Sequence, residues 1–361
     1  MKSLTEIRGE IDALDSELVR LLRRRLEIAD EVADAKRAAG LAVTDATREQ
    51  AVLDQVAAAA GENFAEDVRN FYRGFFAASK ARQRRRLCTL DGARPLRVAV
   101  VGLGLIGGSF FKAARLAGHT VTGLHHGESD GLSVADLVLV CLPPEAIVPW
   151  IKANARHFCR GALVVDICGV KAPIAAAMRE VVRDGWHFVG GHPMAGREVS
   201  GFANSKADLF TGASMILTPE ASLPEFALVT LRNFFRSVGF HRTVLTTPEN
   251  HDSMIAFTSQ LCHVVATAYA RDPRAPEAVG YSAGSYANMT RVATQDAAVW
   301  SALYLENRAA LLDSLDGLIT RLGEFRDALS AADLPRIKKL IDEGTAAKNE
   351  ELLARERGDE A

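Results

Sequence analysis

The most restrictive feature of this sequence is a glycine-rich turn that lies about one hundred residues from the first residue. Residues 100–109 read VVGLGLIGGS. The apolar run from Leu96 to Val101 predicts a buried parallel strand, and Phe110 to Leu116 predicts a helix. A strand, a glycine turn and a helix in this order form the context of a dinucleotide-binding site, with a structural turn in another α/β domain as the alternative. Because the turn comes so late, we expect a separate domain before it.

Each glycine of the turn has its own expected role. Gly102 makes the tight turn, and Gly104 lets the backbone approach a pyrophosphate. Gly107 lets the helix pack closely on the strand, and the helix N-terminus faces the phosphates. The turn therefore predicts where the phosphates of the cofactor bind.

The end of the second strand bears on which dinucleotide is bound. An acidic residue about 20 residues after the glycines would hold the ribose of NAD. This chain has His125 there, with Glu128 and Asp130 close by and no arginine placed to bind the 2′-phosphate of NADP. We therefore favour NAD and leave NADP open. The expected cofactor contacts are Gly102, Gly104, Leu105, Ile106, Gly107 and His125.

Composition excludes several classes of protein. The five cysteines are scattered among 361 residues and never form a CxxC pair, so we expect no disulfide framework, no metal site and a cytoplasmic location. No apolar run approaches the roughly 20 residues that span a bilayer. The net charge is −2, so the basic run from Arg82 to Arg86 is interpreted as a solvated helix end. We expect neither a membrane nor a nucleic acid as a partner.

The N-terminal segment has a helical repeat with an apolar seam. Its members recur in steps of three and four: Leu4, Ile7, Ile11, Leu14, Leu18, Leu21, Ile28, Val32 and Ala35. A helix of about 35 residues, ending at Gly40 as C-cap, would be roughly 50 Å long. Such a helix is too long to be covered by one small domain, so we expect a partner helix from a second subunit.

Two more helices are predicted after this long one. The first begins at Thr44 or Asp45 and ends before Gly61. The second begins near Asn63, where Glu66 three residues later resembles a capping box. The region before the glycine turn is therefore predicted to be entirely helical.

Arg25 interrupts the apolar seam of the first helix. A cation at such a position needs an anion, although a polar residue that sets register or a side chain that reaches solvent is the alternative. Other polar side chains recur at spacings that could line one cavity in a helical dimer: Arg8, Lys36, Asp45, Arg48, Glu49, Ser79 and Gln83. Several cations around one cavity suit a small dianion.

The pattern RxxIDxxDxxLxxLLxxR over residues 8–25, followed by Lys36 and by DxxRE over residues 45–49, resembles the all-helical chorismate mutase family. The resemblance covers residues 1 to about 88. It implies that Arg8 reaches into the partner subunit's site, where Arg25 and Arg48 join it around the two carboxylates of chorismate.

The same resemblance assigns the remaining polar side chains. Lys36 and Gln83 flank the ether oxygen, and Glu49 lies near the substrate hydroxyl. Ser79 and Asp45 support these groups. A pericyclic rearrangement needs only a held conformer and donors aimed at the charge that develops on the ether oxygen, so cations and an amide are suitable groups.

The region after residues 89–95, which are interpreted as a linker, alternates strands with helices. Strands are expected at 96–101, 120–124, 135–142, 162–167, 187–189 and 214–217. This alternation predicts a doubly wound sheet. Little sequence separates the second strand from the third, so we expect that a helix has been lost there.

The candidate chemistry of this region is VGGHPMAGRE at residues 189–198, a turn-rich stretch that leaves a strand at its carboxyl end. Ligands bind at that edge in open α/β sheets. His192 can take a proton from a substrate hydroxyl near neutral pH while hydride leaves for a nicotinamide. From the residues alone, a histidine that only satisfies loop backbone groups is the alternative.

From Leu96 to about Lys348 the chain resembles the prephenate and arogenate dehydrogenases. Five motifs in order carry the resemblance: GLGLIGGS (102–109), VDICGVK (165–171), GGHPMAGRE (190–198), ENHDSMIAFTSQLCH (249–263) and TRVATQDAAVWSALYLEN (290–307). It implies His192 as the catalytic base on the ring hydroxyl and Arg291 as the anchor for a carboxylate. His263 lines the substrate pocket, and Gln295 lies near it.

The chain departs from the family pattern at two positions. Gly169 stands where many members have a serine near the nicotinamide and the catalytic histidine, so that hydrogen bond must come from elsewhere or be dispensable. Asn288 stands where an acidic residue is common, which removes the salt bridge expected at the pocket mouth. Cys168 in the cofactor loop is interpreted as a small buried hydrophobe, with a redox-sensitive thiol as the alternative.

The expected architecture is α + α/β, with a dimerising helical domain at residues 1–88, a Rossmann-like domain at 96–245 and a helical domain for substrate and dimerisation at 246–361. The resemblances imply a homodimeric, bifunctional enzyme of tyrosine biosynthesis that makes prephenate from chorismate and oxidises it to 4-hydroxyphenylpyruvate. Three alternatives stay open: a preference for arogenate, an N-terminal domain that only dimerises or senses product, and a nucleotide-sensing regulator.

Overall fold

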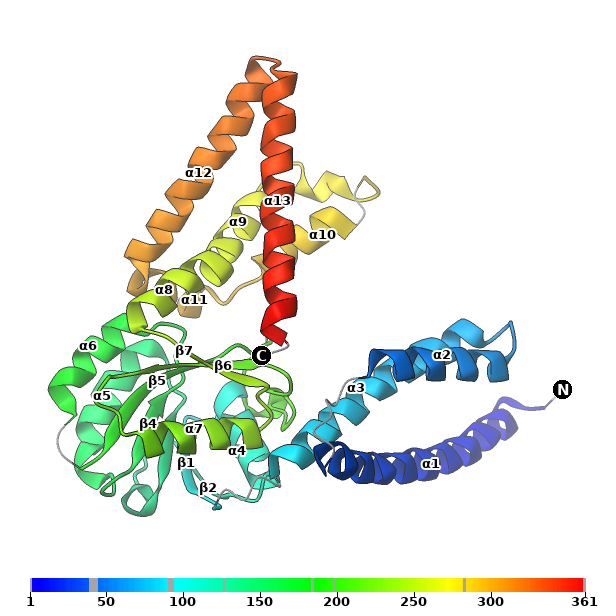
Figure 1. Cartoon of the computed structure of the whole chain (residues 1–361), viewed down its shortest axis with the longest axis horizontal. Coiled ribbons are helices and arrows are strands. Elements are labelled where there is room, and N and C mark those ends of the chain that lie inside the picture. The colour runs from blue at the N-terminus through cyan, green and yellow to red at the C-terminus, as the bar shows by residue number, and fades with distance from the viewer. Residues whose placement is uncertain are drawn as a thin grey trace. The chain divides into compact units, whose positions relative to one another are not determined.

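The computed structural model describes residues 2–38, 45–89, 94–125, 127–182, 185–197, 199–281 and 284–359. The chain divides into two compact units, residues 1–251 and 252–361. The first unit contains three helices followed by a seven-stranded sheet, and the second is helical (Figure 1). The predicted α + α/β class is therefore confirmed. In the described part of the chain, no helix combines the length and the apolar character needed to cross a membrane.

The N-terminal region consists of α1 (Leu4–Ala38), α2 (Ala46–Ala60) and α3 (Ala65–Thr89). α1 begins with a capping box that the sequence interpretation missed: Ser3 N–H donates to Glu6 Oε2 at 2.7 Å, and Glu6 N–H donates to Ser3 Oγ at 3.3 Å. Asp45 caps α2 by accepting from Arg48 N–H at 2.9 Å. Gly40, the predicted C-cap of α1, lies outside the described residues.

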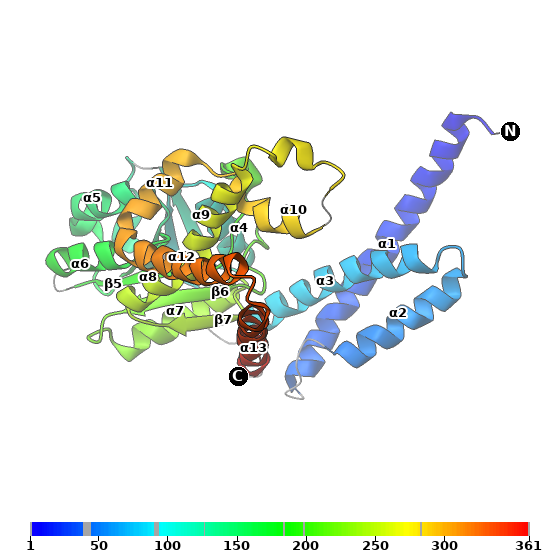
Figure 2. The same cartoon turned by 90° about the horizontal axis from the view of Figure 1, so that it is seen from above.

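α3 packs against both other helices, whereas the N-terminal half of α1 extends beyond them (Figure 2). The C-terminal half of α1 buries Ala29 and Ala33, and Arg82 of α3 forms a two-point ion pair with Asp30 at 2.8 and 2.6 Å. Arg82, interpreted from sequence as part of a solvated helix end, thus ties α3 to α1. Along the N-terminal half the seam is exposed, with Leu14 66% and Leu18 42% accessible.

The sheet has the strand order β2-β1-β3-β4-β5-β6-β7. Its strands are β1 (Arg97–Val101), β2 (Thr120–Leu124), β3 (Leu137–Val140), β4 (Leu163–Asp166), β5 (His187–Pro193), β6 (Ser214–Pro219) and β7 (Arg242–Leu245). All neighbours are parallel except β5 and β6. Only the short 3₁₀ segment Leu132–Val134 is described between β2 and β3, as expected for a lost helix. β7 and the antiparallel pair were not predicted.

Helices cover both faces of the sheet. The helices that flank the sheet are α4 (Leu105–Leu116), α5 (Pro144–Asn154), α6 (Ala172–Val181) and α7 (Glu225–Ser237). α4 and α7 bury one face through a phenylalanine cluster in which Phe110 stacks on Phe210 with ring centroids 4.1 Å apart. α5 and α6 pack against each other and contribute the buried side chains of Trp150 and Met178. Parallel strands buried on both faces explain the continuous apolar runs of the sequence.

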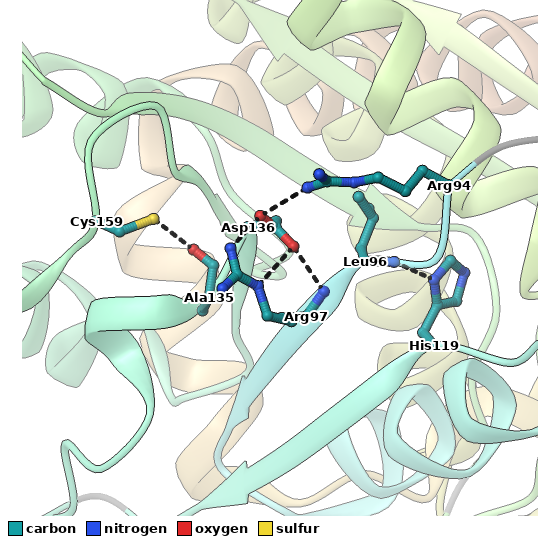
Figure 3. A network of polar contacts seen from close by, with 7 residues as sticks. All are labelled: Arg94, Leu96, Arg97, His119, Ala135, Asp136 and Cys159. Carbon is teal, nitrogen blue, oxygen red and sulfur yellow. Dashed lines mark hydrogen bonds and ion pairs between the residues drawn. The ribbon is translucent and has the colours of Figure 1, made fainter.

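A polar network closes the amino edge of the sheet, opposite the glycine turn (Figure 3). The Asp136 carboxylate accepts from the backbone N–H of Arg97 at 2.8 Å and from the guanidinium groups of Arg97 and Arg94. These hydrogen bonds hold the pKa of Asp136 below its usual value. His119 accepts from the backbone N–H of Leu96 at 3.1 Å. The network fixes the first residues of β1, so we interpret it as structural.

The second unit continues the helix that begins with α8 (Pro248–Ile255). A π-helical turn at Ala256–Gln260 leads into α9 (Leu261–Ala270), followed by α10 (Gly284–Thr290), a 3₁₀ turn at Arg291–Ala293, α11 (Ala297–Glu306), α12 (Arg308–Ser330) and α13 (Leu334–Asp359). Asn307 separates α11 from α12. Its amide donates to the Asp252 carbonyl and to Gln260 Oε1, both at 2.8 Å. This buried amide anchors the break and the π turn.

Candidate active sites

The glycine turn between β1 and α4 has a geometry that only glycine provides at two positions. Gly102 adopts φ +84°, and a Cβ there would overlap the carbonyl oxygen of Cys141. A Cβ at Gly107 would overlap the carbonyl oxygen of Gly102. At Gly104 the space is open, because a Cβ added there would meet no atom within 4 Å. A pyrophosphate fits this arrangement, because the backbone is open at Gly104 and the first N–H groups of a helix have no partner within it.

The carboxyl end of β2 carries a carboxylate as well as the predicted His125. The backbone N–H of His125 donates to Glu128 Oε2 at 2.8 Å, and Glu128 N–H donates back to the His125 carbonyl at 3.0 Å. The turn therefore returns the Glu128 side chain to the end of β2, where a ribose-binding acid is expected. Of the two acids that the sequence offered, Glu128 has this placement.

His192 lies within β5, one residue before its end, rather than in a loop that leaves the strand. β5 was expected to end at Val189, but it continues to Pro193 and pairs with β6 in antiparallel register, with His192 opposite Ile216. Gly190 and Gly191 permit this extension, because a Cβ at either would overlap side chains of the neighbouring strands, including Thr218 and Met215. The sequence interpretation took these glycines as loop residues.

A second histidine contacts His192. His192 Nδ1 lies 2.9 Å from His251 Nε2, and the ring centroids are 5.1 Å apart. His251 comes from α8 and is buried. Burial lowers the pKa of His192 well below its usual value, and the neighbouring His251 and Lys171 lower it further. His192 is therefore neutral at pH 7, which is the state that a general base requires.

A buried ion pair lies beside this histidine pair. Asp166 at the end of β4 and Lys171 before α6 form a short contact, and both side chains are almost fully buried. Asp166 Oδ2 also accepts from the backbone N–H of Cys168 at 3.1 Å, whereas Asp166 Oδ1 has no hydrogen-bond partner. Burial raises the pKa of Asp166, and the positive charge of Lys171 opposes that change. The pair fixes the loop of the VDICGVK motif.

Two residues of this loop had separate interpretations. The Cys168 thiol is buried, and burial raises its pKa to about 11, so it remains protonated at neutral pH. This fits the interpretation of Cys168 as a small apolar side chain. Gly169 cannot donate the side-chain hydrogen bond that a serine would provide. His251 instead supplies the observed ring partner of His192.

In the second unit, the predicted substrate residues lie around the 3₁₀ turn that contains Arg291. His263 Nδ1 lies 3.0 Å from the Val292 carbonyl, so its N–H holds the turn next to Arg291. The His263 ring also packs against Trp300, with centroids 3.7 Å apart and the ring planes tilted by 37°. Arg291 itself is exposed. The anchor predicted from the sequence therefore lies at the surface of this unit.

Gln295 lies next to His263, and the protein engages both ends of its side-chain amide. Its amide nitrogen donates to Thr267 Oγ1 at 2.6 Å and to the His263 carbonyl at 3.3 Å. Its amide oxygen accepts from Tyr304 O–H at 2.7 Å. With both ends of the amide engaged by the protein, Gln295 holds α9 and α11 to the Arg291 turn. We therefore interpret it as a residue that supports the anchor rather than one that contacts substrate.

In the helical N-terminal region, the predicted residues Ser79 and Gln83 form a buried polar pair on α3. Gln83 Nε2 donates to Ser79 Oγ at 3.4 Å, and both side chains are buried. Gln83 Oε1 has no hydrogen-bond partner. A buried amide with an unused hydrogen-bonding end is the arrangement expected for a group that meets a ligand oxygen, since rotation of the amide by half a turn presents its NH₂ there.

Arg25 is half-buried on α1 and lies over the ring of Phe75, with its guanidinium carbon 4.7 Å from the ring centroid. This contact stabilises the cation within one chain and leaves its N–H groups to bind an anion. Glu49 forms an ion pair with Lys80 of α3 at 3.0 Å, a partner that the sequence interpretation did not identify. Arg25 and Glu49 remain partly exposed, so a substrate can compete with Phe75 and Lys80 for them.

The other predicted mutase residues are distributed along α1 and α2. Lys36 is half-buried near the end of α1, whereas Asp45 and Arg48 are exposed, and the Asp45 side chain serves as the helix cap. Arg8 is exposed and precedes Arg25 by about 25 Å along the helix at 1.5 Å per residue. Arg8 is therefore too distant to share a small ligand with Arg25 of the same chain.

Two cavities of the first unit lie away from these residues. One of about 340 Å³ is lined by residues of the amino edge, including His119 and Asp136. Another of about 300 Å³ lies between α6 and the start of β5, beside His187. Neither is lined by His192 or by the glycine turn. The chemistry of the side chains therefore locates the candidate site better than cavity size does.

Comparison with known families divides the chain into three matched segments. Residues 7–84 match the type II chorismate mutase family. Residues 106–244 match the nucleotide-binding domain of prephenate dehydrogenase, and residues 247–343 match its dimerization domain. The two resemblances found in the sequence are thus confirmed.

Individual relatives agree with these matches. A cyclohexadienyl dehydrogenase from Zymomonas mobilis is 32% identical over 265 residues, which are 65% of this chain and 89% of that protein. A T-protein from Haemophilus influenzae is 29% identical over 210 residues, or 56% of this chain and 55% of that protein. The prephenate dehydrogenase from Aquifex aeolicus, solved with hydroxyphenyl propionate and NAD+, shares the fold with a TM-score of 0.64 and 23% identity, over 72% of this chain and 99% of that one.

Proposed function

Because the chain belongs to the prephenate dehydrogenase family and carries a type II chorismate mutase domain, we propose that it catalyses two consecutive steps of tyrosine biosynthesis. The helical N-terminal domain rearranges chorismate to prephenate. The remainder converts prephenate to 4-hydroxyphenylpyruvate by oxidative decarboxylation. The observation that carries the proposal is the order of the matched domains in one chain, since the product of the first is the substrate of the second.

In the dehydrogenase reaction, His192 acts as the base. When bound, NAD accepts the hydride that leaves the ring carbon bearing the hydroxyl. His192 Nε2 takes the hydroxyl proton, the bond to the ring carboxylate breaks to release carbon dioxide, and the ring becomes aromatic. The same nitrogen then returns the proton to the phenolate oxygen. Arg291 binds a substrate carboxylate, and His263 and Gln295 hold the turn that carries it.

NAD is the cofactor that the described residues suit. Gly102, Gly104 and Gly107 with the N-terminus of α4 hold the pyrophosphate. Glu128 returns to the end of β2 beside His125, where a carboxylate binds a ribose 2′-hydroxyl and repels a 2′-phosphate. NAD is therefore preferred over NADP.

The mutase reaction needs a second copy of the chain. Arg25, Lys36, Ser79 and Gln83 come from α1 and α3 of one chain, and Arg8 lies too far along α1 to join them. The exposed apolar seam around Leu14 gives that part of α1 a reason to pack on a partner. We infer a homodimer in which Arg8 completes the partner's cavity. In our proposal the domains extend over residues 1–88, 96–245 and 246–361.

The decisive assay supplies purified protein with chorismate and NAD and follows the absorbance of the reduced cofactor. Reduction from chorismate alone requires both activities in one chain. If reduction appears only when prephenate or arogenate is added, the N-terminal domain is a dimerising or sensing module instead. Comparison of prephenate with arogenate, and of NAD with NADP, then identifies the preferred substrate and cofactor. No reduction with any combination contradicts the dehydrogenase assignment.

A further inference from the structure

We propose that His251 is a positioning residue that holds the His192 ring in the tautomer whose Nε2 carries a free lone pair. The catalytic consequence rests on the proposed function of His192, whereas the tautomer itself can be measured without turnover. The proposal starts from the 2.9 Å separation between His192 Nδ1 and His251 Nε2.

The two rings come from different elements, and each is held in place. His192 lies on β5, between strands β4 and β6. His251 is buried on α8, and its backbone N–H donates to the Thr247 carbonyl at 2.9 Å. Thr247 also accepts at its hydroxyl from Asn250 N–H at 3.2 Å, which fixes the first turn of α8. The approach of the two rings is therefore set by the sheet and a capped helix.

The number of hydrogens between the rings follows from their charge state. The groups that face His192 are His251 from α8, Lys171 from the loop before α6, and Asp166, which is paired with Lys171. Burial keeps His192 neutral, and its neighbours His251 and Lys171 act in the same direction. A hydrogen bond between the two facing nitrogens then requires one hydrogen, carried by one of them.

Two arrangements satisfy this condition, and they have opposite chemical consequences. If His192 Nδ1–H donates to His251 Nε2, His192 Nε2 has no hydrogen and can accept one. If His251 Nε2–H donates to His192 Nδ1, the hydrogen of His192 lies on Nε2, and that nitrogen cannot act as a base. A base at Nε2 therefore needs His251 as the acceptor. The accepted hydrogen bond also persists when His192 becomes charged, so the ring does not have to rotate during the reaction.

The direct test is ¹⁵N NMR of the full-length protein labelled in its histidine rings. The chain has nine histidines, and the signals of His192 are assigned from their loss in His192→Asn. We expect the shifts of His192 to show hydrogen on Nδ1 and none on Nε2 near neutral pH. Hydrogen on Nε2 of His192 would overturn the proposal, whether or not the protein turns over prephenate.

Two variants of His251 separate hydrogen bonding from packing. His251→Gln keeps an amide group about as far from the backbone as Nε2 and can still accept from Nδ1–H. His251→Met has a similar length and no nitrogen or oxygen. We expect His251→Met to lower kcat with prephenate by at least about tenfold with little change in KM, and His251→Gln to retain most of the rate. Thermal melting identifies any loss that comes from unfolding.

The matched control is His187→Gln on the same strand, five positions before His192, which should leave kcat unchanged. The His192 shifts in His251→Met should move toward a mixture of the two tautomers, and those in His251→Gln should not. Equal rates and equal shifts in His251→Met and wild type contradict the proposal. A wild-type protein that has the expected tautomer but reduces no cofactor rejects the proposed function and leaves the positioning role supported.

Discussion

Single side chains in this protein separate the two proposed reactions. His192→Asn removes the base on β5, so we expect cofactor reduction to fall by at least about a hundredfold while chorismate consumption stays near that of wild type. Arg25→Ala removes the cation over Phe75 and should have the reverse effect. Both rates are measured on each variant, with prephenate supplied for the second step. Loss of both activities in either variant would show that the sites are not separate.

The pH dependence of the dehydrogenase follows from the environment of His192. Its active form is neutral, and burial lowers its pKa, with His251 and Lys171 adding to that effect. As the pH falls, kcat/KM should therefore remain level through about 6.5, the ordinary pKa of histidine, and decline only below it. The mutase rate, measured over the same range, is the control and should not share this decline. An acid limb at or above pH 6.5 would contradict a base that is held neutral.

The buried pair Asp166 and Lys171 should be costly to split. Lys171→Met leaves a buried carboxylate without its cation, so we expect a loss of about 3–5 kcal/mol in the free energy of unfolding. Protonation neutralises that carboxyl, whose pKa is raised by burial, so the loss should shrink as the pH falls. Urea unfolding measures both quantities.

The double variant Asp166→Asn with Lys171→Met should regain most of the lost stability, because it leaves no buried charge. The control is Arg179→Met, which splits the exposed pair with Glu220 and should cost no more than about 1 kcal/mol. Equal losses of stability in Lys171→Met and Arg179→Met would mean that burial does not make an ion pair costlier to split.

At the scale of elements, the turn between β1 and α4 combines glycines with different purposes. Gly107→Ala brings a Cβ against the Gly102 carbonyl, so we expect it to destabilise the fold by about 1–3 kcal/mol. Gly104 has φ −77° and open space, so Gly104→Ala should change stability by less than about 0.5 kcal/mol. Its methyl group nevertheless occupies the space assigned to the pyrophosphate, and the Kd for NAD should rise at least about tenfold.

Thermal melting with and without NAD distinguishes these two effects. Without cofactor, Gly104→Ala should have the melting temperature of wild type. When NAD is added, its melting temperature should rise less than that of wild type. If the Gly104→Ala protein binds NAD as tightly as wild type, the pyrophosphate does not bind at this turn. A Gly107→Ala protein as stable as wild type would contradict the packing role.

At the scale of the whole molecule, the mutase activity should depend on association through α1. Leu14→Glu with Leu18→Glu places charges on the exposed seam, so we expect mutase kcat/KM to fall at least about tenfold at low protein concentration. Dehydrogenase kcat should change little. Ser16→Glu on the opposite side of α1 is the matched control. A mutase rate that is unaffected by the seam variant at all concentrations would show that one chain forms the complete site.

Much of the architecture could be predicted because the relevant signals are local. The strand, glycine turn and helix at residues 96–116 are each encoded by neighbouring residues, and so are the long repeat of α1 and the Asp45 cap. β7 was missed because its exposed, four-residue run has no strong pattern. The extension of β5 was missed because paired glycines ordinarily indicate a loop, whereas here neighbouring strands leave no room for side chains.

The sequence by itself determined the order of the domains, the two family memberships and the residue types available for catalysis. Only the tertiary structure decided which of those residues meet. His192 and His251 are 59 positions apart, and Glu49 and Lys80 are 31 apart, so no periodicity or spacing relates them. Their distances follow from how helices pack and how strands register. A local pattern fixes an element, but the contacts between elements depend on the packing of the entire core.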